Sequence, residues 1–370
     1  MNISFVLDSF GGGGKERRCL QLIQGLNKQD GFNIQVIIVN NDVSYPELYE
    51  TNIDLQIIDS KKRKLNIVQT SLFLYRLLKD FNPDIVQAWG VFSSFFINPI
   101  SCFLPFKYIG AYVANCNKPK KLSYERFTVL INTWLADCII GNSEAGIKAY
   151  GIPKRKAKVI YNGFNEERYA VTETTRSELK QQMGIQAKFV IAMIARVDIN
   201  KDYETYIRAA KLILEQKSDI LFLIVGSGPN LIPLQSLISD NEKKYFNFLG
   251  FRSDIEKILR ITDVSVLCTN PQKHKEGVSN SIMESLAFGV PVIATNDGGT
   301  PEIIESGING FLINAYDSKE LKDKILQLID DEMLIKKISD TAKLTIETKF
   351  NLNLMTSKYI DLYKSLLGKS

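Results

Sequence analysis

Histidine is almost missing from this chain, since only one, His274, occurs among 370 residues. Cysteine is sparse as well, and the five cysteines form no Cys-x-x-Cys pair and no pairing pattern that suggests disulfides. Scattered free cysteines favour a reducing compartment, and so few histidine and cysteine ligands argue against a transition-metal centre.

A membrane-spanning segment is also missing. The most apolar stretch, residues 91–106, is interrupted by Asn98, Pro99 and Pro105 and falls short of the ~20 apolar residues that a spanning helix needs. The start, MNISFVLDS, lacks a basic segment followed by a long apolar run, so it predicts a first strand and not a signal peptide. With 45% hydrophobic and 24% charged residues, the chain is long enough for two globular domains. We therefore expect a cytoplasmic protein.

Acidic residues are scarce in the first half of the chain. Residues 1–170 contain 21 Lys and Arg against 15 Asp and Glu, a net charge of +6, whereas residues 171–370 contain 25 against 26, a net charge of −1. The simpler interpretation is a solvated basic face, and the sharper one is a peripheral position on an anionic membrane surface or an anionic lipid-linked substrate. Nucleic acid is not expected, because no recognition helix or RNA-binding aromatic motif occurs. The basic clusters are Lys61 to Lys64; Lys118, Lys120, Lys121 and Arg126; and Lys154, Arg155, Lys156 and Lys158.

Short β-branched runs alternate with helical patterns along the whole chain. Runs such as ISFVL, IQVIIV and KYIGAYV, and later KFVIAMIA, ILFLIVG and PVIAT, are apolar on both faces, as in parallel sheets covered by helices. The alternation is interrupted at residues 162–175 (NGFNEERYAVTETT), which we interpret as a linker. The pattern predicts two Rossmann-like α/β domains, residues 1–165 and 166–349, and a final helix in residues 350–370 that packs back on the first domain.

Glycine is concentrated where the first predicted strand ends, in GGGGKERR from Gly11 onward. Ligands of open α/β sheets bind at the carboxyl ends of the strands, and a glycine turn lets the backbone approach an anion at the start of the next helix. Neither common phosphate motif fits, because the third glycine of GxGxxG would fall on Glu16 or Arg17, and Lys15 is followed by Glu16 instead of Ser or Thr. Plain loop flexibility is the alternative interpretation.

The second half of the chain places two cations at the same kind of position. Arg196 and Lys201 follow KFVIAMIA, where a strand gives way to a helix. Two fixed cations there suit a diphosphate, since charge-assisted contacts to phosphate are strong and Arg engages two oxygens at once. An isolated Arg and Lys are more often plain surface charge. The next strand ends in VGSGP, with Gly226 and Gly228, and the following one ends in FLGF at Phe251.

Two glutamates flank the start of another predicted helix, in HKEGVSNSIMESLAFG (residues 274–289). Ser279 or Asn280 is the expected N-cap and a glycine ends the helix. Glu276 precedes this start and Glu284 lies about one turn inside it, so the backbone N–H groups of the first turn lie between the two carboxylates. Because a carboxylate repels phosphate, we expect these amides to hold phosphate and each glutamate to accept hydrogen bonds from sugar or ribose hydroxyls.

In this order, the motifs resemble those of the retaining GT-B glycosyltransferases of family 4. EGVSNSIMESLAFGVPVIATNDGGTPEII resembles the Glu-x7-Glu signature of that family, and the likeness extends over most of the chain. It includes the glycine turn, NSE at 142–144, VIYNGFNEERY at 159–169, Arg196 with Lys201, VGSGP, FLGF and NGFLI at 309–313. The resemblance implies two facing Rossmann-like domains, a nucleotide sugar bound mainly by the second, an acceptor held mainly by the first, and a role in bacterial polysaccharide biosynthesis.

Carried over position by position, the resemblance assigns Glu276 to hydroxyls of the transferred sugar and Glu284 to the ribose. Arg196 and Lys201 would neutralise the diphosphate leaving group. The implied reaction transfers the sugar with retained configuration; the departing phosphate helps to remove the proton of the acceptor hydroxyl, and no covalent enzyme intermediate is required. The other implied donor-binding positions are Phe251 and Arg252 for the base and, for the phosphates, Gly12, Gly13, Gly226, Gly277, Val278, Ser279 and Asn280.

The resemblance also implies a UDP- or GDP-sugar donor and a glycan or lipid-linked acceptor. No Asp-x-Asp occurs, the pattern by which the other large glycosyltransferase fold holds a divalent cation, so we expect neither a metal nor a cofactor.

One departure from the family concerns histidine. Many members carry a histidine after the strand that corresponds to KYIGAYV, where it contacts the donor sugar, whereas this chain reads AYVANCN. Asn115, Asn117 or the carbonyl of Val113 could take its place. Trp89 occupies another position where histidine is common, and His274 is either an exposed loop residue or a group beside the sugar.

Four other functions are alternatives to sugar transfer. A nicotinamide-dependent oxidoreductase would also be doubly wound, but its glycine motif and the acidic residue after its second strand do not fit this chain. A noncatalytic partner subunit on the same fold, and a sugar-nucleotide epimerase or a phosphorylase, remain open.

Overall fold

A computed structural model describes residues 1–167 and 174–368 of the chain. It divides into two compact units, the first made of Met1–Gly163 with Leu352–Ser370 and the second of Phe164–Asn351. The boundaries predicted from the sequence are 165/166 and 349/350, each two residues from the boundary between these units. The middle of the expected linker, residues 168–173, lies outside the described residues.

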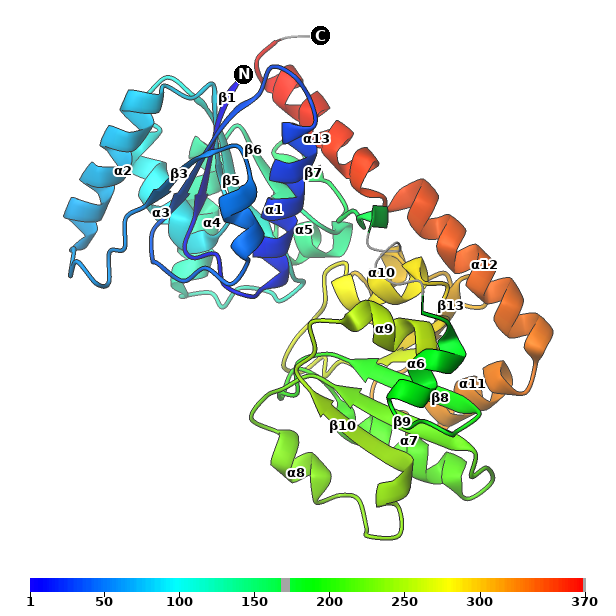
Figure 1. The fold of residues 1–370 in the computed structure, drawn as a ribbon. Helices are drawn as coiled ribbons and strands as arrows, with labels where there is room; N and C mark the ends of the chain where they lie inside the picture. Colours follow the sequence, from blue (N-terminus) through cyan, green and yellow to red (C-terminus); the bar gives the residue numbers. More distant parts are fainter. Residues whose placement is uncertain (168–173, 369–370) are drawn as a thin grey trace. The chain divides into compact units, whose positions relative to one another are not determined.

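The first unit contains a seven-stranded parallel sheet in the order β3-β2-β1-β4-β5-β6-β7 (Figure 1). The order reverses between β1 and β4, because the chain builds outward from β1 in one direction and then returns to its other side. The strands are β1 Asn2–Leu7, β2 Asn33–Ile38, β3 Asp54–Ile57, β4 Ile85–Ala88, β5 Lys107–Val113, β6 Cys138–Gly141 and β7 Ala157–Val159.

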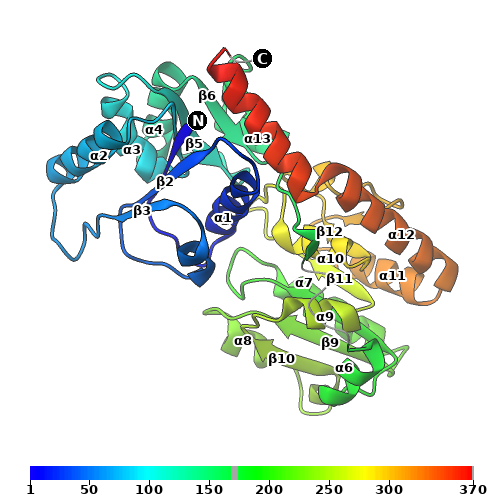
Figure 2. The same ribbon diagram turned by 45° about the horizontal axis from the view of Figure 1, so that its top comes forward.

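Both faces of this sheet are covered, which explains why its central strands are apolar throughout. Ile3, Phe5 and Leu7 of β1 point to the face that carries α1 and α13, whereas Val6 points to the face that carries α2 to α5. Figure 2 shows α3 between α2 and α4, and the contacts between these helices agree with that view. The helices are α1 Gly14–Asn27, α2 Ile67–Phe81, α3 Val91–Ile100, α4 Tyr124–Leu135, α5 Glu144–Tyr150 and α13 Leu352–Leu366, with a 3₁₀ turn η1 at Pro46–Glu50.

The last helix, α13, belongs to the first unit, as the sequence predicts. It packs along α1, where Thr356 lies against Gly25 so closely that a side chain at Gly25 would not fit. Its Tyr363 hydroxyl donates a 2.7 Å hydrogen bond to the buried amide oxygen of Gln87 on β4. The chain end is therefore part of the core that supports α1.

The second unit contains a six-stranded parallel sheet in the order β10-β9-β8-β11-β12-β13, with its own reversal between β8 and β11 (Figure 1). The strands are β8 Phe189–Ile194, β9 Ile220–Val225, β10 Phe246–Gly250, β11 Val264–Leu267, β12 Val292–Thr295 and β13 Gly310–Ile313. The helices are α6 Arg176–Gln182, α7 Tyr203–Leu214, α8 Leu231–Gln235, α9 Ile255–Ile261, α10 Asn280–Ala287, α11 Ser318–Ile329 and α12 Glu332–Lys349, with 3₁₀ turns η3 Lys243–Tyr245 and η4 Thr300–Glu302.

The fold class predicted from the sequence, two parallel-sheet α/β domains flanked by helices, is thus confirmed. None of the helices in the described part of the chain is both long and apolar enough to cross a membrane.

Candidate active site

The switch point of the second sheet is the natural place for a ligand, because ligands of open α/β sheets bind outside the carboxyl ends of the strands where the strand order reverses. Residues 195–202 follow β8 and residues 268–279 follow β11, so both stretches singled out in the sequence reach this edge. The two loops are joined to each other: Lys201 and Thr269 form an isolated antiparallel bridge, and the amide of Asp202 donates to the carbonyl of Cys268 (3.0 Å).

Lys201 and Glu276 meet at this edge. The Lys201 ammonium forms an ion pair with Glu276 Oε1, and the two side chains are only 14% and 12% exposed. His274 Nε2 lies 3.6 Å from the same carboxylate oxygen. The sequence predicts that Lys201 binds phosphate and that Glu276 binds hydroxyls; in the structure, which contains no ligand, each side chain has the other as its partner.

The Glu276 carboxyl is held as an anion. Burial disfavours its ionisation, but the nearby Lys201 ammonium and the hydrogen bond and charge of His274 outweigh burial and lower its pKa from 4.5 to about 2. Glu276 is therefore an obligate hydrogen-bond acceptor at neutral pH, which suits contacts with hydroxyl groups.

This lowered pKa predicts a stability that depends on pH. The Glu276 carboxyl has an ordinary pKa of 4.5 in the unfolded chain, so its contribution to stability is complete at neutral pH and is lost as the pH falls from about 5.5 towards 2. In urea unfolding at pH 7 down to pH 3, the free energy of unfolding of the wild type should therefore decrease relative to that of Glu276→Gln. Glu215→Gln, at an exposed position just after α7, is the matched control. A difference between wild type and Glu276→Gln that stays constant with pH contradicts the ion pair.

Two glycines hold the loop after β8 against β9. A Cβ at Gly226, which has φ +146°, would overlap the carbonyl oxygen of Ala195, and a Cβ at Gly228 would overlap that of Val197. The amide of Val197 donates to the carbonyl of Ser227 (3.0 Å). VGSGP therefore brings the backbone of β9 close to the residues that flank Arg196, and only glycine allows this approach.

A third glycine, which the sequence analysis did not single out, positions Glu276. Gly298 has φ +60°, and a Cβ on it would overlap the Glu276 carbonyl oxygen and lie 3.1 Å from the Glu276 amide nitrogen. The next amide, of Gly299, donates to that carbonyl (2.8 Å), and Lys275 pairs with Asp297 (2.8 Å). The sequence signal was present in the turn NDGG, but the sequence does not show which loop the turn contacts.

Helix α10 begins at Asn280, with Ser279 as its N-cap residue, as predicted. The Ser279 side chain makes no capping hydrogen bond, and Ser281 Oγ instead donates to the carbonyl of Ile194 at the end of β8 (2.7 Å). The start of α10 is thus fixed beside β8, next to Gly277 and Val278, both of which are buried. Glu284, one turn inside the helix, is also buried, with 8% of its surface exposed.

The side chains of Arg196 and Arg252 each pair with a nearby aspartate, which the sequence did not predict. Arg196 is at the right edge of the sheet, but its side chain is 75% exposed and Nε lies 3.3 Å from Asp198 Oδ2. Arg252 forms two hydrogen bonds with Asp254, at 2.8 and 2.6 Å. Phe251 follows β10, and 78% of it is exposed. In the sheet, β10 lies two strands from β8, a spacing of about 10 Å between the strands.

The glycine turn of the first unit has acidic surroundings. Gly13 is the N-cap of α1 and is packed so closely on the Glu16 carboxylate that a Cβ would overlap it. The Lys15 ammonium lies 3.2 Å from Glu16 and 3.7 Å from Asp8. Two carboxylates with one ammonium suit hydroxyl groups better than a phosphate beside Gly12 and Gly13.

A cavity of about 370 Å³ lies beside this cluster, at the carboxyl ends of β1, β4 and β5 and hence at the switch point of the first sheet. Asp8 in its wall accepts a 2.6 Å hydrogen bond from the amide of Ser93 at the start of α3. Two other lining residues are joined by a hydrogen bond, which the Tyr150 hydroxyl donates to the Glu125 carboxylate (2.7 Å). Burial, followed by the hydrogen bond and charge of Glu125, raises the pKa of Tyr150 well above its ordinary value, so this hydroxyl stays protonated. Phe92 and Tyr124 add aromatic surface.

The groups proposed to replace the family's histidine lie in different surroundings. Asn115 lines this cavity; its side-chain oxygen accepts from the amide of Asn117 (2.9 Å) and lies 3.2 Å from the Tyr150 hydroxyl oxygen. The carbonyl of Val113 accepts from the amide of Asn142 (3.0 Å). Trp89 is fully buried and packs on Tyr112 with ring centroids 5.0 Å apart, so it is a core residue and no site residue.

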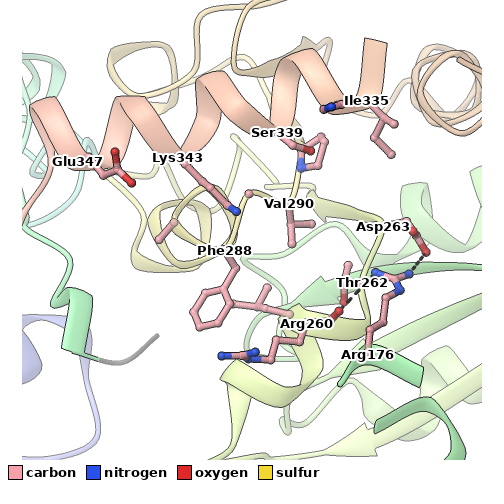
Figure 3. A pocket seen from close by; sticks show the side chains of 15 residues that line it. Arg176, Arg260, Thr262, Asp263, Phe288, Val290, Ile335, Ser339, Lys343 and Glu347 are labelled. Atoms are coloured by element: carbon pink, nitrogen blue, oxygen red, sulfur yellow. Dashed lines mark hydrogen bonds and ion pairs between the residues drawn. The ribbon is translucent and has the colours of Figure 1, made fainter. Parts of the chain in front are cut away.

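A cavity of about 670 Å³ in the second unit lies at the amino ends of β11 and β12, the side of the sheet opposite to the carboxyl ends of the strands (Figure 3). It is lined by the end of α10 at Phe288, by Val290 before β12 and by α12. Arg176 at its rim pairs with Asp263 (2.7 Å). Since ligands of open α/β sheets bind at the carboxyl ends of the strands, the carboxyl ends of β8 and β11 remain the candidate active site, and this cavity does not.

No group of three or more His, Cys, Asp and Glu side chains suited to a metal ion occurs within residues 1–167 and 174–368. The Asp8, Lys15 and Glu16 cluster contains only two carboxylates, and an ammonium lies between them.

Comparison with known families matches nearly all of this architecture. Residues 12–168 match the family model described as Glycosyltransferase Family 4, and residues 175–345 match the one described as Glycosyl transferases group 1. The two models together cover most of the chain, which belongs to these glycosyltransferases. The resemblance found in the sequence is thereby confirmed, and residues 175–345 of this glycosyltransferase contain the Lys201 and Glu276 pair.

Curated relatives of this glycosyltransferase are moderately similar in sequence. The putative glycosyltransferase EpsD of Bacillus subtilis is 29% identical over 247 residues, which cover 64% of each chain. The UDP-Gal:alpha-D-GlcNAc-diphosphoundecaprenol alpha-1,3-galactosyltransferase of Escherichia coli is 28% identical over 80% of this chain and 79% of its own. The N-acetyl-alpha-D-glucosaminyl L-malate synthase of Bacillus anthracis is 27% identical, and the matched region covers 55% of it. These three relatives are thus matched over 55% to 79% of their own length.

Solved structures share the fold. The Anabaena protein HepE, solved in complex with UDP and with UDP-glucose, superposes with TM-scores of 0.86 and 0.84, at 22% identity, over 99% of this chain and all of its own.

Proposed function

We propose that this glycosyltransferase moves a sugar from a nucleotide-diphosphate sugar to a hydroxyl of a glycan or lipid-linked acceptor, with retained anomeric configuration and without a metal ion. The observation that supports this most is the buried pair of Lys201 and Glu276 at the switch point of the second sheet, beside the side-chain-uncapped start of α10. A fixed cation, a fixed anion and a helix start at one edge suit three groups of a sugar diphosphate: one phosphate, a sugar hydroxyl and the other phosphate.

In this proposal Lys201 binds the diphosphate while it keeps its contact with Glu276. An ammonium has three donors, so one is retained by the carboxylate and the others are available to phosphate oxygens. Glu276 accepts hydrogen bonds from hydroxyls of the transferred sugar, and Glu284 from those of the ribose. Arg196 completes the diphosphate contacts by leaving Asp198, a change that its 75% exposure makes inexpensive.

The chemical step then needs little covalent participation from the protein. The acceptor oxygen bonds to the anomeric carbon as the bond from that carbon to the diphosphate oxygen breaks, and the departing phosphate takes the proton of the acceptor hydroxyl. The products are a glycoside and a nucleoside diphosphate. Lys201 and the start of α10 stabilise the negative charge that develops on the leaving group.

The acceptor is assigned to the cavity of the first unit. Asp8 and Glu125 offer hydrogen-bond acceptors for hydroxyls, and Phe92 and Tyr124 offer ring faces for the apolar side of a sugar. We assign the donor as a UDP-sugar, with a GDP-sugar as the second choice, because the E. coli relative is named for UDP-Gal and HepE was solved with UDP-glucose. The same relative is named for a diphosphoundecaprenol acceptor, which favours a lipid-linked one here.

The decisive experiment measures nucleotide release by the purified chain from UDP- and GDP-sugars, with and without a lipid-linked glycan acceptor and with excess chelator. The proposal is supported in full if nucleotide release depends on the acceptor and persists in chelator. The coupling constant of the anomeric proton in the product should also show the same anomeric configuration as in the donor. Donor binding without turnover on any acceptor would instead indicate a noncatalytic nucleotide-sugar-binding subunit.

The ribose assignment makes a separate prediction. Glu284→Gln keeps the size of the side chain but removes the anion, so binding of bare UDP, measured by calorimetry, should weaken about tenfold through loss of a charge-assisted hydrogen bond. Glu302→Gln in η4, on the same unit, is the control and should bind as the wild type does. Unchanged affinity of Glu284→Gln would remove Glu284 from the nucleotide site.

A further inference from the structure

Helix α4 exposes its apolar side. Phe127 is 60% exposed, Leu130 44% and Trp134 84%, and their spacing of three and four residues places them along one stripe of the helix. The residues that α4 buries are instead Thr128, Val129 and Asn132.

This arrangement has a packing cause. The buried side of α4 lies on β5, where a Cβ at Gly110 would approach Asn132 within 3.2 Å, and Asn132 lies 3.2 Å from the buried Tyr108 hydroxyl. Small and polar side chains fit this close approach, so the large apolar ones are left outside. Single exposed apolar residues are ordinary on protein surfaces, but a contiguous stripe ending in a tryptophan marks a surface that something covers.

Charge identifies the class of partner. Lys118, Lys120 and Lys121 are exposed in the loop that leads into α4, and Leu122 beside them is fully exposed. The acidic residue of α4, Glu125, accepts the hydrogen bond of Tyr150. The stripe is therefore bordered by positive charge, as in helices that lie in the interface of an anionic bilayer.

Helix α2, on the other side of α3, shows the same combination of basic and exposed apolar residues. The exposed cluster Lys61 to Lys64 precedes α2, whose first turns expose Ile67 (59%), Val68 (65%) and Leu72 (51%). Because α3 packs between α2 and α4 on one face of the first sheet, the two basic and apolar regions belong to one side of the first unit (Figure 2).

We infer that this side of the first unit docks on an anionic bilayer, with Phe127, Leu130 and Trp134 of α4 inserted among the lipid headgroups. Docking is independent of the proposed reaction, but it explains how that reaction would reach a lipid-linked acceptor. Tyr124 at the start of α4 lines the acceptor cavity, so the cavity begins where the apolar stripe begins.

A second copy of this chain is a less suitable partner. A two-fold contact through α4 brings the same surface of both copies together, and Lys118, Lys120 and Lys121 of one copy would then approach their equivalents. An anionic lipid surface satisfies the same lysines.

The chain contains its own probe for this contact. Its two tryptophans differ completely in environment, because Trp89 is fully buried in the core and Trp134 is 84% exposed. A change in tryptophan emission or in quenching by a water-soluble quencher on addition of vesicles therefore reports on Trp134.

The experiment titrates the full chain with vesicles of phosphatidylcholine alone and of phosphatidylcholine with 30 mol% phosphatidylglycerol, at about 0.1 M salt. We expect sedimentation with the anionic vesicles, a blue shift of Trp134 emission and quenching by brominated lipid. Phe127→Ser with Leu130→Ser should weaken vesicle binding about tenfold or more. Lys118→Gln with Lys120→Gln and Lys121→Gln should weaken it about fivefold per lysine, and only on anionic vesicles.

The matched control is Met333→Ser with Leu344→Ser on α12, which changes two residues exposed by 84% and 56% on the second unit and should bind vesicles as the wild type does. Turnover on a short water-soluble acceptor should be unchanged in the α4 variant, so failure of docking and failure of the proposed reaction can be distinguished. The inference is overturned if the anionic vesicles leave Trp134 emission unshifted, or if sedimentation velocity finds a dimer of the wild type that the α4 variant lacks.

Discussion

Lys201→Ala is expected to lower turnover about 10²-fold or more while the fold is retained, because it removes a preorganised cation from the diphosphate that departs in the proposed reaction. The side chain of Lys201 is 14% exposed, and no other lysine or arginine forms an ion pair with Glu276 in the described part of the chain. Lys217→Ala is the matched control, since Lys217 also forms an ion pair, with Asp330 (2.6 Å), but on an exposed surface. Nucleotide release at saturating donor measures both variants. A Lys201→Ala enzyme with wild-type turnover would remove Lys201 from the reaction.

A double variant separates two causes of that loss. In Lys201→Ala the Glu276 carboxylate stays buried without its ammonium, so part of the loss could arise from a displaced loop instead of a missing phosphate contact. Lys201→Ala with Glu276→Gln removes this orphaned charge. If the double variant remains as slow as Lys201→Ala, the lysine acts on the diphosphate; if turnover returns towards that of Glu276→Gln alone, the lysine acts by holding Glu276.

The sequence was sufficient for the sheets because their strands are apolar on both faces and are separated by helical patterns. The edge strand β7, Ala157–Val159, contains only three residues, which are too few for such a pattern. Its place in the sheet depends on its pairing with β6.

The edge that carries the candidate site was predictable as well, since ligands of doubly wound sheets bind where the strand order reverses. The side-chain partners at that edge were not. Lys201 and Glu276 are 75 residues apart, and their pairing depends on the bridge between the loops after β8 and β11. The pairs of Arg196 with Asp198 and Arg252 with Asp254 involve near neighbours, but the choice between such a pair and an open side chain is a matter of rotamers, which the sequence pattern does not encode.

Helix α4 illustrates a different limit. An amphipathic pattern predicts a helix, and the usual assumption is that its apolar side is buried. In α4 the close approach to β5 at Gly110 reserves the buried side for Thr128 and Asn132. The direction in which an amphipathic helix faces is therefore a property of the surface beneath it.

Gly298→Ala is expected to lower turnover about 10²-fold, because its Cβ would overlap the Glu276 carbonyl oxygen and force the loop to shift by a fraction of an ångström or more. Part of any effect comes from backbone strain, since Gly298 has φ +60° and a left-handed alanine costs about 1–2 kcal/mol. Gly307→Ala isolates that part. Gly307 has φ +82° and no atom within 4 Å of the added Cβ.

Gly298→Ala should thus lose more stability in urea unfolding than Gly307→Ala, because only its Cβ overlaps a backbone atom, and only Gly298→Ala should lose turnover. The fold of Gly298→Ala is checked by circular dichroism, and the position of Glu276 by the pH dependence of unfolding, which should be weaker than in the wild type. Equal losses of turnover in both variants would mean that backbone strain elsewhere in the second unit also lowers turnover, so that the loss in Gly298→Ala is not specific to the position of Glu276. Full activity in Gly298→Ala would mean that the position of Glu276 does not limit the reaction, and the assignment of the active site to the carboxyl ends of β8 and β11 would then lose its main support.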